Sequence, residues 1–201
     1  MKKTIITISR EFGSGGRELG KRMADVLGWD YYDREIIDRI AQEQGLDSEY
    51  VQTVLEKHEW RSVPISYRRS FMVTGKQDTS LLVQEKKLIE RIAATGNPSI
   101  IVGRNADVFL RGQNTFSIFV CAEQEAKLQR CRERDTQGHS DREIERQMKR
   151  IDKARAATRE LVAGNTWGKR DSYHLTVNTT GWDLKILAPV VAEYAKQWFA
   201  R

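Results

Sequence analysis

A strand-like run, a glycine-rich turn and an amphipathic helix follow one another at the start of the chain. Residues 4–9 (TIITIS) form a β-branched run typical of a buried parallel strand, and Gly13-Ser14-Gly15-Gly16 follows it. Residues 17–27 then carry apolar side chains at helical spacing, and Gly28 ends the helix. Glycines in such a turn let backbone N–H groups converge on an anion at a helix N-terminus. The order predicts a phosphate-binding loop, with a plain tight turn as the alternative.

The loop lacks the lysine of the usual pattern G-x-x-x-x-G-K-[ST]. When residues 9–15 are laid on the first seven positions of a kinase loop, Gly16 stands where the lysine is expected. Arg17 follows it, where the pattern has the Ser or Thr that usually contacts Mg²⁺, and Glu18 comes next. A neighbouring cation would have to replace the lysine, and the candidates are Arg10, Arg17 and Lys21. Without the hydroxyl, Mg²⁺ would be held mainly by phosphates and water.

Strand-like and helical segments alternate along the rest of the chain. The strand-like segments are 29–32, 99–102, 116–121 and 173–178, and the helical segments are 34–60, 81–94, 123–161 and 183–199. Residues 61–80 have weak periodicity and predict a loop or short helices. The alternation predicts an α/β fold with a parallel sheet wrapped by helices. Ligands of such sheets bind beyond the carboxyl ends of the strands, where Ser9-Arg10, Tyr32-Asp33, Gly103-Arg104 and Cys121 stand here.

Composition limits the class of protein. The 201 residues suit one domain, with room for a mobile lid or an insertion. A formal net charge of +6 suggests an anionic partner, and both nucleotides and nucleic acid fit that charge. Two cysteines without metal-ligand spacing fit a reducing compartment. We find neither a signal-peptide pattern nor an apolar run of about 20 residues, and therefore expect a cytoplasmic protein with no membrane partner.

Several segments, in order, resemble the cytidylate kinase-like family, a divergent branch of the bacterial cytidylate kinases. They are ITISREFGSGGRELGKRMADVLGWDYYDREII, IIVGRNADVFL, FSIFVCAEQEAKLQRCRER, the D-x-x-R of RIDKAR, and WGKRDSYHLTVNT. The resemblance runs from about residue 3 to residue 180, is weakest across 42–80, and includes the loop without the lysine. The resemblance implies a P-loop NTPase-like fold. It also implies an enzyme that uses Mg²⁺ and transfers the γ-phosphoryl group of ATP to a pyrimidine nucleoside monophosphate.

The resemblance also implies site residues. The ATP phosphates would lie against Arg10, Gly13, Ser14, Gly15, Gly16, Arg17, Glu18 and Lys21. Asp33 and Arg39 match the D…R of a monophosphate-binding segment, and Arg104 matches the arginine of a G-R-D motif. Asn105 replaces the Asp of that motif, so Asp107 is a candidate to compensate. The catalytic arginines would be Arg17, Arg104, Arg150 and Arg155, the last two in the lid. Residues 34–95 would form an acceptor-binding helical insertion, and residues 130–170 would form the lid.

Three functions stay open at this stage. The first is a nucleoside monophosphate kinase that prefers CMP or dCMP. The second is a P-loop kinase for another small acceptor, since the residues that would read the base depart from the family pattern. The third is a nucleotide-sensing or RNA-binding protein without catalysis. The arginines at strand ends and the lack of a usual RNA-binding motif make nucleic acid the weakest candidate partner.

Overall fold

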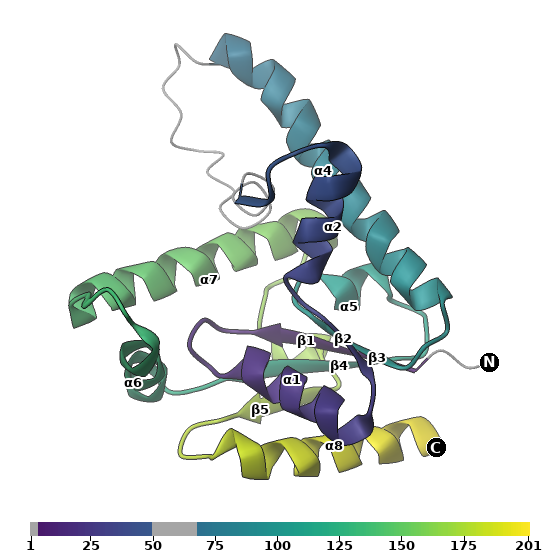
Figure 1. Cartoon of the computed structure of the whole chain (residues 1–201), viewed down its shortest axis with the longest axis vertical. Helices are drawn as coiled ribbons and strands as arrows, with labels where there is room; N and C mark the ends of the chain where they lie inside the picture. The colour runs from purple at the N-terminus through teal and green to yellow at the C-terminus, as the bar shows by residue number, and fades with distance from the viewer. Residues whose placement is uncertain (1–3, 50–67) are drawn as a thin grey trace.

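In the computed structural model, residues 4–49 and 68–201 are described. Five strands form one sheet: β1 (Ile5–Arg10), β2 (Asp30–Tyr32), β3 (Ser99–Val102), β4 (Thr115–Cys121) and β5 (Leu175–Asn178). Their spatial order is β2-β3-β1-β4-β5, and every neighbouring pair is parallel. The predicted α/β fold with a parallel sheet is therefore confirmed. Because the strands are parallel, all their carboxyl ends meet at one edge (Figure 1).

The helices are α1 (Gly16–Leu27), α2 (Glu35–Gln44), α4 (Arg68–Ala94), α5 (Ala106–Phe109), α6 (Gln124–Arg134), α7 (Asp141–Ala163) and α8 (Leu184–Ala200), with a 3₁₀ turn at Arg170–Ser172. No helix in the described part of the chain is both long and apolar enough to cross a membrane. The helical stretch expected over 123–161 is divided between α6 and α7. Ser140 is the N-cap of α7 and forms a capping box with Glu143. The side chain of each residue accepts a hydrogen bond from the backbone N–H of the other.

Two expectations for the region between α2 and β3 need correction. The helix expected over 34–60 ends at Gln44, where Gly45 adopts a left-handed cap, and residues 50–60 lie outside the described residues. The loop or short helices expected over 61–80 are wrong for residues 68–80, which are the first half of α4. Val73, Thr74 and Gly75 are weak helix formers that hid this half. Once the second half is folded, extension is cheaper than nucleation.

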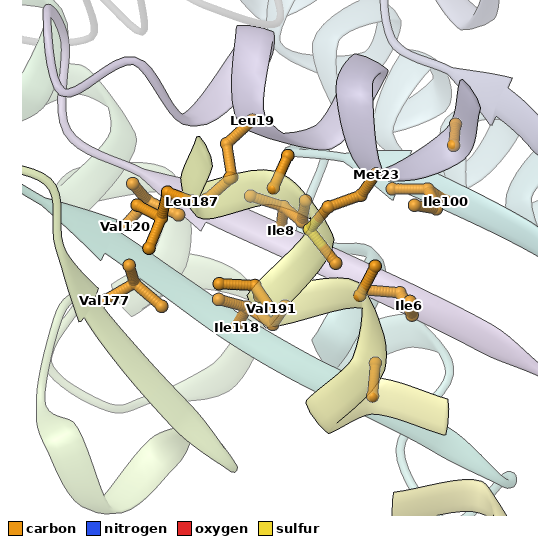
Figure 2. Packing of buried hydrophobic residues seen from close by; sticks show 14 of the residues in the cluster. Ile6, Ile8, Leu19, Met23, Ile100, Ile118, Val120, Val177, Leu187 and Val191 are labelled. Atoms are coloured by element: carbon orange, nitrogen blue, oxygen red, sulfur yellow. The ribbon is translucent and has the colours of Figure 1, made fainter. Parts of the chain in front are cut away.

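The sheet is packed on both faces because its side chains alternate. Ile6 and Ile8 of β1 face α1 and α8, whereas Ile5 belongs to the cluster formed with α2, α4 and α5. Figure 2 shows Leu19 and Met23 of α1 and Leu187 and Val191 of α8 packed against strand residues. The β1–α1 loop is thus held between a strand that is buried up to its last residue and a helix anchored in the core.

Candidate phosphate-binding site

A cleft of about 410 Å³ opens at the carboxyl ends of the strands, between the β1–α1 loop, α6 and α7. Figure 1 shows this loop projecting towards α6 below α7. Glycines of the loop line the cleft. Its charged lining residues are seven arginines (Arg10, Arg17, Arg34, Arg104, Arg130, Arg134 and Arg155) and three acids (Glu11, Asp33 and Asp135). Seven cations against three anions leave a formal excess of four positive charges, which favours a polyanionic ligand.

The loop adopts the backbone conformation that its glycines permit. Gly13 and Gly15 lie in the left-handed region, with φ of 77° and 78°. A Cβ atom at Gly15 would lie 2.7 Å from Leu184 Cδ1, so any other residue there would force the Leu184 side chain to shift. The first bond into α1 runs from Leu19 N–H to the Gly15 carbonyl (2.9 Å). Ahead of it, Gly16 N–H lies 3.4 Å from Ser14 Oγ, and the N–H groups of Arg17 and Glu18 belong to the first turn of the helix, which is where helices bind anions.

Ser14 shapes the loop from below. Its side chain is buried, and its hydroxyl donates to the Glu11 carbonyl (2.8 Å). Its own carbonyl accepts a hydrogen bond from Thr179 Oγ1 (2.7 Å), and Arg130 Nη1 lies 3.4 Å away. Arg130 also donates to the Thr179 carbonyl (2.7 Å). Sequence reasoning missed Arg130 and Thr179, which lie in segments that carry the family resemblance but at no diagnostic spacing.

Asp33 is paired with cations of the loop. Its side chain is 5% exposed, contacts Arg17 Nε directly, and has Arg10 Nη2 at 3.7 Å. Burial alone would lower the pKa of Arg17, but Asp33 and Tyr31 together outweigh it and the pKa is raised. Arg17 therefore stays charged beside the glycine loop, and Asp33 neutralises part of the positive charge there.

Arg104 projects from a strained turn. Gly103, Arg104 and Asn105 have consecutive positive φ angles of 77°, 60° and 49°. A left-handed backbone is uncommon for residues other than glycine, and asparagine tolerates it better than most. Arg104 is nearly buried and lies 3.9 Å from Glu85 Oε1 of α4, itself 3% exposed. Arg104 lines both the cleft and an adjoining hollow of about 60 Å³ that also contains Trp167. Strain of this kind is concentrated at functional sites.

The D-x-x-R motif ties α7 to the glycine loop. Asp152 Oδ1 accepts a hydrogen bond from Phe12 N–H (2.8 Å) and one from Arg155 Nη1 (3.1 Å). Arg155 also donates to the Arg10 carbonyl (3.0 Å) and lines the cleft. Burial raises the pKa of Asp152 although the Phe12 bond opposes this. Arg150, the other expected lid arginine, is exposed and is not among the residues that line the cleft.

Residues 5–181 match the profile of the cytidylate kinase-like family. The chain belongs to that family. None of the curated protein sequences compared with it is similar enough to count as a relative. The predicted family is therefore confirmed over almost the whole length of the resemblance.

Solved structures show the same fold as this member of the cytidylate kinase-like family. An uncharacterized protein from Eubacterium ventriosum ATCC 27560 superposes with a TM-score of 0.71 at 22% identity, over 96% of this chain and 98% of that one. Shikimate kinase from Bacteroides thetaiotaomicron gives 0.58 at 15% identity, over 96% and 98%. Shikimate kinase from Acinetobacter baumannii, in complex with shikimate, gives 0.55 at 12% identity, over 98% and 94%. The parallel sheet flanked by helices is thus the P-loop kinase fold.

Two expected phosphate contacts on α1 point elsewhere in this cytidylate kinase-like chain. Glu18 pairs with Arg22 (2.9 Å) and with Arg134 (2.6 Å). Lys21 is largely exposed and pairs with Asp25 (2.7 Å). Neither Glu18 nor Lys21 lines the cleft. Their places on the outer side of α1 turn both side chains away from the glycine loop, so adjacency in sequence did not give adjacency in the site.

Two expected acceptor contacts also lie apart from the cleft. Asp107 is bound to the fully buried Arg159, and Ser9 Oγ is 3.5 Å from its other carboxyl oxygen. Asp107 therefore belongs to a buried ion pair and is not among the residues that line the cleft. Arg39 is exposed and lines a separate hollow between α2 and α4. Arg34, five residues earlier at the N-cap of α2, does line the cleft.

Proposed function

We propose that the protein transfers the γ-phosphoryl group of ATP to a nucleoside monophosphate, with CMP or dCMP as the leading acceptor. One observation carries the proposal: a glycine loop at the N-terminus of α1 borders a cleft whose charged lining is seven arginines and three acids. Membership of the cytidylate kinase-like family and the P-loop kinase fold support phosphotransfer over simple nucleotide binding.

The arrangement suits phosphoryl transfer because that reaction depends on positioning and charge neutralisation rather than on covalent help from the protein. In the proposed complex, N–H groups of the loop and first turn of α1 hold the phosphates of ATP. Arg104 reaches the acceptor side from the end of β3, and Arg155 reaches it from α7. Arginine suits both places because it stays charged and binds phosphate with two parallel hydrogen bonds.

Two segments of the chain would bind the acceptor and close the site without taking part in the chemical step. We infer that residues 34–95 bind the acceptor and that residues 130–170 act as a lid. The contacts from Asp152 to Phe12 and from Arg155 to the Arg10 carbonyl support the lid, because they join α7 to the loop that would hold the donor. A lid in this place would keep water from the phosphoryl group and so suppress ATP hydrolysis.

Mg²⁺ would bind through the nucleotide more than through the protein. The carboxylates nearest the loop are paired with cations, Asp33 with Arg17 and Glu11 with Lys127 (2.9 Å). Across the residues whose side chains are described, no three His, Cys, Asp or Glu gather in a way that could hold a metal ion. This arrangement of carboxylates fits a Mg²⁺ ion that is coordinated chiefly by phosphate oxygens and water, as is common at kinase sites.

A kinase for another small acceptor is the second candidate. Of the two residues matched to the monophosphate-binding segment, Asp33 is paired with arginines and Arg39 lies in a separate hollow. Both observations weaken the match to a pyrimidine-binding pattern. They leave the donor side of the proposal unchanged.

A turnover assay separates these candidates. Purified protein is incubated with ATP, Mg²⁺ and each of a panel of nucleoside monophosphates, and ADP and nucleoside diphosphate are quantified by chromatography. We expect ADP and CDP or dCDP to form in equal amounts, above a control without acceptor. ADP formation that depends only on a non-nucleotide acceptor would favour the second candidate. Failure to bind any nucleoside triphosphate in calorimetry would refute a kinase altogether.

A further inference from the structure

The loop carries an arginine and a glycine in exchanged places relative to the pattern G-x-x-x-x-G-K-[ST]. With Gly16 at the lysine position, the first glycine of the pattern falls six residues earlier, at Arg10. The chain thus has the cation where the pattern has glycine, and glycine where the pattern has the cation.

The structure shows that these two positions share one space. A Cβ atom at Gly16 would lie 2.6 Å from Arg10 Cβ and 3.2 Å from Arg10 Cγ, and it would lie 3.1 Å from Val120 Cβ. Two Cβ atoms cannot approach to 2.6 Å, because each is fixed by its backbone and cannot rotate away. Only one of positions 10 and 16 can therefore carry a side chain, and here Arg10 fills the volume that the stem of a lysine at 16 would need.

From that starting point, the Arg10 side chain runs across the strand ends into the site. Its guanidinium lies over Gly103, where a Cβ atom would overlap with it, and 3.7 Å from Asp33. The side chain is 15% exposed and lines both the cleft and the smaller hollow beside Arg104. Its carbonyl is held by Arg155 (3.0 Å). The stem of Arg10 thus lies against Gly16 of the glycine loop, and its guanidinium lies beside Gly103 and Asp33, largely shielded from water, among the residues that line the cleft.

We propose that Arg10 is the cation that binds the transferring phosphates, acting from the end of β1 as the usual lysine acts from the start of the helix. The proposal rests on the proposed function, since it needs a polyphosphate in the loop. Arg17 and Lys21 fit the role less well. The Arg17 side chain is 62% exposed and is engaged with Asp33, while Lys21 lies outside the cleft. A guanidinium also grips two phosphate oxygens at once.

A charge-relocation experiment tests this assignment. Four proteins are compared: the wild type, Arg10→Gly, Gly16→Lys, and the double variant, which restores the usual pattern. We expect Arg10→Gly to lower kcat/KM for ATP by about 10²-fold, the scale for loss of one preorganised charge contact. Gly16→Lys alone should lose activity and stability because of the clash. The double variant should regain at least about tenfold over Arg10→Gly, since both contacts with Arg10 are then gone and only the 3.1 Å contact with Val120 Cβ has to relax.

Controls separate binding from folding. Lys21→Ala removes a neighbouring cation outside the cleft and should change kcat/KM by less than about twofold. Arg10→Lys keeps the charge without the forked geometry and should retain more activity than Arg10→Gly. If Arg10→Gly is destabilised and unfolds at a lower urea concentration, the comparison of Arg10→Lys with the wild type still tests whether Arg10 binds the phosphates. Calorimetric affinity for a non-hydrolysable ATP analogue with Mg²⁺ should follow the same order as kcat/KM.

The two proposals fail in different ways. If the wild-type protein binds no nucleoside triphosphate, both are refuted. If it binds the analogue but Arg10→Gly and Arg10→Lys bind as well and turn over as fast, only the role of Arg10 is refuted. A folded double variant no more active than Arg10→Gly also counts against it, because the arginine would then act through Asp33 and not through phosphate.

Discussion

Replacement of Arg104 by glycine tests whether the strained turn after β3 exists to present a guanidinium to the site. Arg104 and Asn105 have φ angles of 60° and 49°, which residues other than glycine adopt at a cost of about 1–2 kcal/mol each. Glycine at 104 removes one of these costs. It also removes the arginine that lies 3.9 Å from Glu85, a carboxylate that is 3% exposed.

Loss of the arginine beside Glu85 has a larger effect on stability than relief of the backbone strain. Removing one partner of a buried ion pair typically destabilises a protein by about 3–5 kcal/mol, because the other charge stays buried. Set against the relieved backbone, the expected net loss for Arg104→Gly is about 1–4 kcal/mol. Neutralising the remaining carboxylate with Glu85→Gln should restore most of that loss. Neither change returns the guanidinium, so the double variant should stay as inactive as the single one.

The assay pairs urea unfolding, followed by tryptophan fluorescence, with steady-state kinetics on the acceptor found in the turnover panel. We expect kcat/KM to fall at least about 10²-fold in both variants, with stability recovered only in the double variant. Arg111→Ala, an exposed arginine outside the cleft, is the matched control and should change neither quantity appreciably. A variant folded at the assay temperature with kcat/KM within threefold of the wild type would refute the role of Arg104.

Two further predictions concern stability. Asp107→Asn should destabilise the protein by about 3–5 kcal/mol in urea unfolding, because it leaves the fully buried Arg159 without its carboxylate; a loss below about 1 kcal/mol would contradict the pair's importance. His174 Nδ1 accepts a hydrogen bond from Ser117 N–H (2.9 Å), and burial, with Arg201, lowers its pKa below the ordinary value. The unfolded chain therefore binds the extra proton more readily, so the free energy of unfolding should fall as pH drops below about 6.5. His174→Asn, which keeps an acceptor, should lose this part of the pH dependence, and identical pH profiles for the two proteins would contradict the assignment.

The sequence determined the fold class and the family because both depend on local order along the chain. The β-branched strand, the glycines and the first helix stand in consecutive positions, and their arrangement survives whatever packs around them. The D-x-x-R motif was likewise predicted from sequence, and Arg155 does line the cleft. Helix α4 was only half predicted, because its first half has no apolar repeat and becomes helical by extension from the second.

Only the tertiary structure decided which charged side chains face the site. Lys21 and Arg39 stand only five or six residues from Gly16 and Asp33 in the sequence, yet neither lines the cleft. The sequence alone showed that glycine, and not lysine, stands at position 16. That Arg10 occupies the same space is a fact of packing between β1 and the start of α1, and spacing along the chain carries no information about such a contact.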